Sequence, residues 1–173
     1  MKILVFSDSH GNPSNISKAI KMHPDAELLI HLGDGINDLY KIKETYPDYE
    51  AVTVYGNFED SFFVKKSENT FNCVTANGKK IFLCHGHRYS VGFSKQNLIY
   101  AALEQGADIA LFGHTHVKHN EYLPPERLNT NTEKGLYLFN PGSISRPRDS
   151  IYASFGIIEI RDDGILLSHC IIK

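Results

Sequence analysis

The sequence lacks the features that mark several large classes of protein. Within its 173 residues, no apolar run approaches the roughly 18–20 residues that a membrane-spanning helix needs. The formal net charge is only −2, so there is no polycationic signature of nonspecific nucleic-acid binding. Linkers, low-complexity stretches and internal repeats are also missing, which predicts a single domain over residues 1–173. We therefore expect neither a membrane partner nor a strong nucleic-acid partner.

Cysteine is also scarce. Cys73, Cys84 and Cys170 are odd in number and show no Cys-x-x-Cys spacing. This pattern is typical of reduced thiols in a cytosolic protein, not of disulfides or structural zinc ligands. The first apolar run, Lys2–Phe6, is too short for a signal peptide and is followed by acid and histidine. A buried strand explains this run better, and we expect a cytoplasmic protein.

The first half of the chain alternates predicted strands with predicted helices, which indicates a parallel sheet. The apolar segments Lys2–Phe6, 28–32 and 51–55 predict the strands. Segments Pro13–Met22 and 39–46 predict the helices, the first of them from apolar residues at helical spacing.

The second half has a different pattern. Asn77-Gly78 predicts a β-hairpin, because both turn positions favour positive φ. A helix is expected at 94–105 with Ser94 as its N-cap, and segment 124–134 is polar and loop-like. The expected strands are Phe71–Ala76, Lys79–Cys84, 109–112, 136–140, 154–160 and 165–172. The whole pattern predicts an α/β fold of mixed α+β character, with two mixed sheets packed face to face and helices outside.

One pattern recurs at the ends of five predicted strands. Each strand is followed by a side chain that can bind a metal, usually beside a glycine that allows a sharp turn. Because open α/β sheets bind ligands outside the carboxyl ends of their strands, these five ends should converge in one crevice. The converging residues are Asp8, His10, Asp34, Asn57, His85, His114 and His116.

The chemistry of this set favours transition metals. Carboxylates, an amide carbonyl and imidazoles without thiolates suit Mn²⁺, Zn²⁺, Fe or Ni²⁺ better than Ca²⁺ or Mg²⁺. Seven candidate ligands are too many for one tetrahedral site. They fit two metals that share a carboxylate, roughly 3.5–4 Å apart, a separation typical of phosphoester chemistry. We expect two divalent transition metals per chain, with Mn²⁺ as the first choice.

The same residues carry a resemblance to a known family. In order, the motifs Asp8-Ser-His10, Gly33-Asp34, Gly56-Asn57, His85 and Gly113-His114-Thr-His116 resemble those of the calcineurin-like metallophosphoesterase superfamily. The small size and the Asn140-Pro-Gly-Ser143 segment resemble its compact phosphodiesterase branch, the YfcE-like proteins of bacteria and archaea. The resemblance covers nearly the whole chain and implies a four-layer αββα sandwich.

The resemblance also implies residue roles. It implies that Asp34 bridges two metals, and that a metal-bridging hydroxide is the nucleophile. Asp34, Asn57 and His85 would then act through that hydroxide. The implied ligands of one metal are Asp8, His10, Asp34 and His116, and those of the other are Asp34, Asn57, His85 and His114.

One position departs from the pattern of many family members. These members carry a histidine directly after the motif asparagine, and it is implicated in substrate binding and leaving-group protonation. Here the position holds Phe58, which can transfer no proton. The compact branch generally lacks this histidine as well, so its absence indicates the subfamily. We assign no catalytic role to the neighbouring Glu59.

Four residues are candidates for contact with substrate, namely Asn57, His87, Arg146 and Arg148. His87 is also a candidate proton donor, and the alternative is an ordinary supporting role. Arg146 and Arg148 either clamp a phosphate or form a solvated basic loop. His31 lies inside a strand and is interpreted as a hydrogen-bonded structural histidine. Ser143 is interpreted as a turn residue, since no base accompanies it in sequence.

The sequence therefore predicts a metal-dependent phosphoric ester hydrolase that cleaves phosphodiester bonds in a small substrate. Two alternatives stay open. One is a phosphomonoesterase acting on a small metabolite or nucleotide. The other is a non-catalytic scaffold of the same fold, like the small subunit of the retromer complex. The complete ligand set favours the enzyme. The natural substrate and the physiological metal are not encoded in the sequence, and a homodimer stays open.

Overall fold

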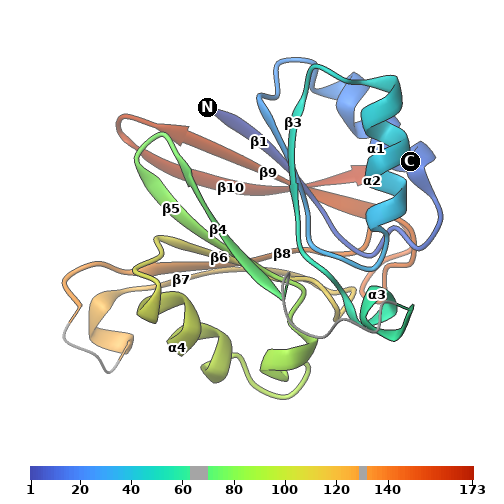
Figure 1. The fold of residues 1–173 in the computed structure, drawn as a ribbon. Helices are drawn as coiled ribbons and strands as arrows, with labels where there is room; N and C mark the ends of the chain where they lie inside the picture. Colours follow the sequence, from blue (N-terminus) through green and yellow to red (C-terminus); the bar gives the residue numbers. More distant parts are fainter. Residues whose placement is uncertain (63–69, 129–131) are drawn as a thin grey trace.

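The computed structural model describes residues 1–62, 70–128 and 132–173. Its strands form two five-stranded mixed sheets that pack face to face, and helices cover both outer faces (Figure 1). The layers run helix, sheet, sheet, helix, which confirms the four-layer α/β sandwich. Within the described ranges, no helix is long and apolar enough to cross a membrane.

The first sheet has the strand order β10-β9-β1-β2-β3. Strands β1, β2 and β3 run parallel, while β9 and β10 extend the sheet in antiparallel fashion. Helices α1 and α2 cover its outer face (Figure 1). The bounds are β1 Lys2–Phe6, α1 Pro13–Met22, β2 Leu28–His31, α2 Ile36–Thr45, β3 Glu50–Thr53, β9 Ala153–Arg161 and β10 Gly164–Ile172.

The second sheet has the order β4-β5-β6-β8-β7. Its three middle strands, β5, β6 and β8, run parallel, and antiparallel partners flank them. Helix α4 covers the outer face. The bounds are α3 Asn57–Phe62, β4 Phe71–Ala76, β5 Lys79–Cys84, α4 Gln96–Glu104, β6 Ile109–Leu111, β7 Lys118–Leu123 and β8 Leu136–Pro141, with 3₁₀ turns at His87–Tyr89 and Pro125–Arg127.

The central strands are buried on both faces, which explains their continuous apolar sequences. In β1, Ile3 and Val5 pack between the two sheets, against residues of β5 and β6. Leu4 and Phe6 point the other way and pack against Ile16 of α1. Because successive side chains of a strand point to opposite faces, β1 places apolar side chains in two separate cores.

The structure corrects several local predictions. Helix α2 begins at Ile36, three residues before the expected start, and Lys95 instead of Ser94 is the N-cap of α4. Strand β7 and helix α3 were not predicted. The first is a polar edge strand, and the second is too short to show a helical period. The hairpin at Asn77-Gly78 is confirmed, and residues 129–131 of the expected loop 124–134 lie outside the described part.

Candidate metal centre

All seven candidate ligands come together at one end of the two sheets, where the parallel strands end. Asp8 follows β1, Asp34 follows β2 and Asn57 begins α3 after β3. His85 follows β5, and the pair His114 and His116 follows β6. Each of the seven places a polar atom within 4 Å of a polar atom of another. The sequence expectation of one shared crevice is met, whereas the roles of these residues as ligands stay predictions.

The first group of ligand atoms comes from Asp8, His10 and His116. His116 Nε2 lies 3.2 Å from Asp8 Oδ1 and 3.4 Å from His10 Nε2. All three atoms lie within 4.8 Å of one another, which is close enough for one cation to contact them together.

The second group comes from Asn57, His85 and His114. Asn57 Oδ1 lies 3.2 Å from His85 Nε2 and 2.9 Å from His114 Nδ1. His114 therefore presents Nδ1 to this group, whereas His85 presents Nε2. An amide oxygen and two imidazole nitrogens are suitable ligands for a divalent transition metal.

Asp34 lies between the two groups. Its Oδ2 is 3.5 Å from His85 Nε2 in the second group and 3.9 Å from His10 Nε2 in the first. Its other oxygen, Oδ1, accepts a hydrogen bond of 2.8 Å from the Phe58 N–H. One oxygen is thus held by the protein, and the other faces both groups, as a bridging ligand must.

The backbone conformation of the ligand loops is unusual. Seven non-glycine residues among those described have positive φ, and five of them are candidate ligands, with φ between 46° and 67°. This left-handed region is sparsely populated by residues with a Cβ, and each such residue costs roughly 1–3 kcal/mol. The five are Asp8, His10, Asp34, His114 and His116. Such strain at one location is typical of a functional site.

Two glycines explain how the loops approach each other so closely. A Cβ on Gly33 would lie 2.5 Å from the Gly56 backbone nitrogen. A Cβ on Gly56 would overlap the Asp34 carboxylate. Any side chain at either position would push the Asp34 loop away from the Asn57 loop. These glycines therefore set the distance between the bridging acid and the second group.

Backbone carbonyls fix the orientation of two ligand imidazoles. His85 Nδ1 lies 2.7 Å from the Leu32 carbonyl oxygen, and His116 Nδ1 lies 2.7 Å from the Arg146 carbonyl oxygen. Because a carbonyl can only accept, Nδ1–H donates in both rings. In the neutral rings this leaves the Nε2 lone pair directed at the centre, as metal binding requires.

The electrostatics of the centre favour ionised acids. Burial opposes ionisation of Asp34, but His85 and the Phe58 N–H outweigh it and lower the pKa of Asp34 to about 2. Burial also disfavours protonation of His85, yet Asp34 and Asp8 raise its pKa above the usual value. Asp8 likewise raises the pKa of His116. In the metal-free protein, the acids therefore favour protonation of these two histidines.

One buried atom tests whether the residues fit a cation. Asp8 Oδ2 accepts hydrogen bonds from the Ser7 hydroxyl at 2.5 Å and from the His114 N–H at 3.2 Å. Asp8 Oδ1 is fully buried, and His116 Nε2, 3.2 Å away, can donate to it only when the imidazole is protonated. A buried carboxylate oxygen without a donor is costly unless a cation contacts it. The residues therefore fit divalent metal ions.

Glu59 is a positioning residue that the sequence did not reveal. This buried carboxylate accepts hydrogen bonds of 2.6–3.1 Å from the backbone N–H groups of Asp34, Gly35, Ile36 and Gly56. It thereby joins the loop of Asp34 to the loop of Asn57. Its partners are backbone groups, which leave no mark in a sequence.

A second buried network supports the loop between Asp8 and His10. Asp38 Oδ2 accepts hydrogen bonds from the Ser9 hydroxyl at 2.7 Å and from the Gly11 N–H at 2.8 Å. His31 accepts the Gly33 N–H at Nδ1, and its Nε2 lies 3.1 Å from Ser9 Oγ. Burial lowers the pKa of His31 to about 4, so the ring is neutral. The interpretation of His31 as a structural histidine is confirmed.

The end of β8 and the segment after it contact ligand loops of both sheets. Asn140 Nδ2 donates a hydrogen bond of 2.9 Å to the Gly113 carbonyl in the loop before His114. The Ser143 hydroxyl donates to the Asp8 carbonyl at 2.8 Å. Ser143 is fully buried in this arrangement, which agrees with a turn residue and not with a nucleophile.

The remaining candidates lie around the centre. His87 lies beside the second group, with ring-centre distances of 5.4 Å to His85 and 6.1 Å to His114. Arg146 and Arg148 line the same cavity of about 470 Å³ as Asp34 and Asn57. Both arginines therefore lie beside the candidate ligands. Their clamping role and the proton-donor role of His87 stay predictions.

Known proteins share this fold and size. The calcineurin-like phosphoesterase superfamily domain matches residues 1–163. The probable metallophosphoesterase YsnB of Bacillus subtilis is 30% identical over 172 residues, covering 95% of this chain and 87% of its own length. Phosphodiesterase YfcE of Escherichia coli K12 is 27% identical over 179 residues, covering 92% and 88%. A Streptococcus pneumoniae TIGR4 crystal structure, titled as a conserved uncharacterized protein and predicted phosphoesterase, has a TM-score of 0.76 at 26% identity, covering 98% of this chain and 88% of that one.

Proposed function

The chain belongs to the calcineurin-like phosphoesterase superfamily, in its YfcE-like branch, and from that premise we propose that it hydrolyses phosphodiesters at a dinuclear metal centre. Membership makes the protein a phosphoric ester hydrolase that uses divalent metal ions. The observation that supports the finer proposal is the position of Asp34 Oδ2, which faces a His10 nitrogen on one side and a His85 nitrogen on the other.

In this proposal the two groups hold one cation each. Asp8, His10 and His116 hold the first, Asn57, His85 and His114 hold the second, and Asp34 contacts both. When bound, two such cations neutralise charge on the phosphoryl oxygens and lower the pKa of the attacking water. Mn²⁺ is the metal that we propose for this ligand set.

Side chains of the protein orient the substrate and bind its charged oxygens. Arg146 and Arg148 line the cavity over the centre, where their guanidinium groups bind the free phosphoryl oxygens. Phe58 provides no proton for the leaving group, so that proton comes from water or from His87. A substrate whose leaving group is already a weak base is therefore cleaved fastest.

Two other functions compete with this proposal. A phosphomonoesterase would use the same centre but accept a phosphate with one substituent. A scaffold of the same fold could bind metal at the same ligand set without hydrolysing an ester, so turnover separates the two. A cytoplasmic location stays a prediction, and a homodimer stays open.

The test is the replacement Asp34→Asn in protein reconstituted with Mn²⁺. Loss of the bridging charge should weaken both sites and reduce hydrolysis of bis(4-nitrophenyl) phosphate at least about a hundredfold. Bound metal, measured by elemental analysis, should fall from two ions per chain to one or fewer. Asp25→Asn is the control, because Asp25 is exposed and pairs with Lys2 at 2.6 Å, away from the centre.

Each alternative gives a different result. Faster cleavage of 4-nitrophenyl phosphate than of the diester would indicate the monoesterase. Two bound metals without hydrolysis of either ester would indicate the scaffold. A wild-type stoichiometry at or below one ion per chain would contradict the dinuclear centre.

A further inference from the structure

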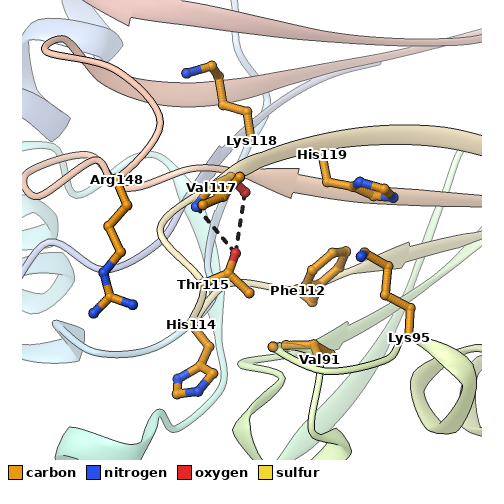
Figure 2. Close-up of a pocket in the computed structure, with 10 residues that line it drawn as sticks. Val91, Lys95, Phe112, His114, Thr115, Val117, Lys118, His119 and Arg148 are labelled. Atoms are coloured by element: carbon orange, nitrogen blue, oxygen red, sulfur yellow. Dashed lines mark hydrogen bonds between the residues drawn. The ribbon is translucent and has the colours of Figure 1, made fainter.

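A second cavity opens beside the metal centre, next to His114 (Figure 2). Its volume is about 460 Å³, which lies within the range of sites for small molecules. It shares His114 and Arg148 with the cavity that contains Asp34 and Asn57. A substrate bound at the centre can therefore extend past His114 into this second space.

The charge of this cavity is positive. Figure 2 shows Lys95 and Arg148 on opposite sides of it. Lys118 and His119 also line it, but each has a carboxylate partner, at 3.0 and 3.1 Å respectively. In the part of the chain that the structure describes, no acidic residue lines the cavity, and neither Lys95 nor Arg148 forms an ion pair. Two positive charges are thus left for a ligand.

The surface between the two cations is only partly apolar. Val117 is 40% exposed and lies between Lys95 and Arg148 in Figure 2, with Thr115 and His114 beside it, whereas Phe112 and Val91 are almost fully buried. The cavity therefore has one cation on each side and a surface of mixed polarity between them. Such a surface can accommodate an uncharged group that joins two anions.

We propose that this cavity binds one substituent of the phosphodiester, and that this substituent carries a second phosphate. The proposal rests on the proposed function, because it assigns a substrate class to the same centre. The scissile phosphate lies over Asp34 and beside Arg148, which lines both cavities, and the substituent passes Val117 toward Lys95, which binds the second phosphate. A phosphate carries a charge of about −1.5 to −2 near neutral pH, which Lys95 partly neutralises.

The test compares two substrates that differ only in the second phosphate. These are thymidine 5′-(4-nitrophenyl phosphate) and its 3′-phosphorylated derivative, and released nitrophenol is measured with the Mn²⁺-reconstituted protein. The wild type should prefer the 3′-phosphorylated substrate about tenfold in kcat/KM, chiefly through a lower KM, because hydrogen bonds to charged groups are strong. Lys95→Ala should reduce this preference to about twofold or less.

Two control lysines locate the effect. Lys21→Ala changes an exposed lysine of α1, which lies in a separate hollow with Ile171, and should keep the full preference. Lys41→Ala changes a lysine in the cavity on the other side of the centre, beside Phe58, and should also keep it. A preference that survives Lys95→Ala, or that disappears with Lys41→Ala, would overturn the proposal.

A binding measurement separates this proposal from the proposed function. Calorimetry with the metal-free protein compares thymidine 3′,5′-bisphosphate with thymidine 5′-monophosphate. The bisphosphate should bind more tightly, and Lys95→Ala should remove the difference. If the wild type hydrolyses both diesters without a preference, and binds both nucleotides equally, the second phosphate site is wrong. If it hydrolyses neither diester but shows the Lys95-dependent binding difference, the proposed function fails and the phosphate site stands.

Discussion

The ligand loops on the first-sheet side of the centre and those on the second-sheet side are held in place by hydrogen bonds of opposite kinds. On the first-sheet side, the carboxylates of Glu59 and Asp38 accept hydrogen bonds from backbone N–H groups of the ligand loops. On the second-sheet side, side chains donate instead: His85 and His116 donate ring N–H groups to backbone carbonyls, and Asn140 donates its amide to the loop before His114. The first side therefore depends on side-chain acceptors, and the second depends on side-chain donors.

This difference has an electrostatic consequence. The first side collects four buried carboxylates, on Asp8, Asp34, Asp38 and Glu59. The second side supplies imidazoles whose positive charge depends on pH. Without metal, the acids raise the pKa of His85 and so attract protons to it. Because ligation needs the neutral imidazole, protons and metals compete for the same atoms, and metal affinity should fall as pH falls.

Among residues that support the ligand loops, the largest effect is expected for Glu59→Gln, which breaks the support of the first side. A neutral amide offers one acceptor oxygen, and its NH₂ group faces backbone donors that need an acceptor. The loops of Asp34 and Asn57 should loosen, with a loss of about 10–100-fold in diester hydrolysis and a lower Tm.

The matched control is Glu44→Gln, at an exposed position of α2. Raising the Mn²⁺ concentration should restore part of the Glu59→Gln activity, because the ligands themselves are intact. Wild-type activity and Tm in the Glu59→Gln variant would contradict the claim that carboxylates hold this side.

A smaller effect, of opposite sign on the two sides, is expected in the pH dependence of stability. The pKa of His31, on the first side, is lowered to about 4. Its contribution to the free energy of unfolding is therefore present above pH 6.5 and is lost as pH falls toward 4. The pKa of His116, on the second side, is raised, so its contribution is present below pH 6.5 and is lost as pH rises through the folded pKa.

Urea unfolding of the metal-free protein between pH 4.5 and 8 measures both contributions. His31→Gln should flatten the decline of the unfolding free energy toward acid, while His116→Gln should flatten its decline toward alkali. Changes in the same direction for both variants would show that the two sides do not differ in this way.

The comparison also shows what sequence alone could predict. Strand β1 and the acid that follows it were predictable, because a doubly buried strand is a continuous apolar run and the ligand lies directly after it. Strand β7 was not, since it is an edge strand whose residues are mostly polar. Glu59 was noticed but given no role, because its partners are backbone N–H groups brought together only by the fold. Lys95 gave no signal, since its relation to the centre depends on how α4 packs.

Phe58 occupies a position beside the centre that could hold a general acid, but its side chain has no proton to donate. Its ring is 51% exposed and stands edge-on to His10, with ring centres 6.2 Å apart. Its backbone N–H contacts Asp34, so the position is fixed relative to the centre whatever side chain it carries. The ring also lines a cavity of about 490 Å³ together with Lys41 and Arg146. A side chain at this position can therefore reach a leaving group on that side of the phosphate.

The smallest effect is accordingly expected for Phe58→His, which places an imidazole at this open position. A positioned general acid contributes typically about 10²–10⁴-fold, but an imidazole without a supporting partner should contribute about tenfold or less. The gain should appear only for poor leaving groups, because 4-nitrophenolate departs without a proton. Log kcat/KM plotted against leaving-group pKa should therefore be steep for the wild type and shallower for Phe58→His. Phe58→Leu, which changes shape without adding an acid, should keep the steep slope. Equal slopes in all three proteins would show that position 58 does not face the leaving group, and would place the departing oxygen on the His114 side of the centre instead.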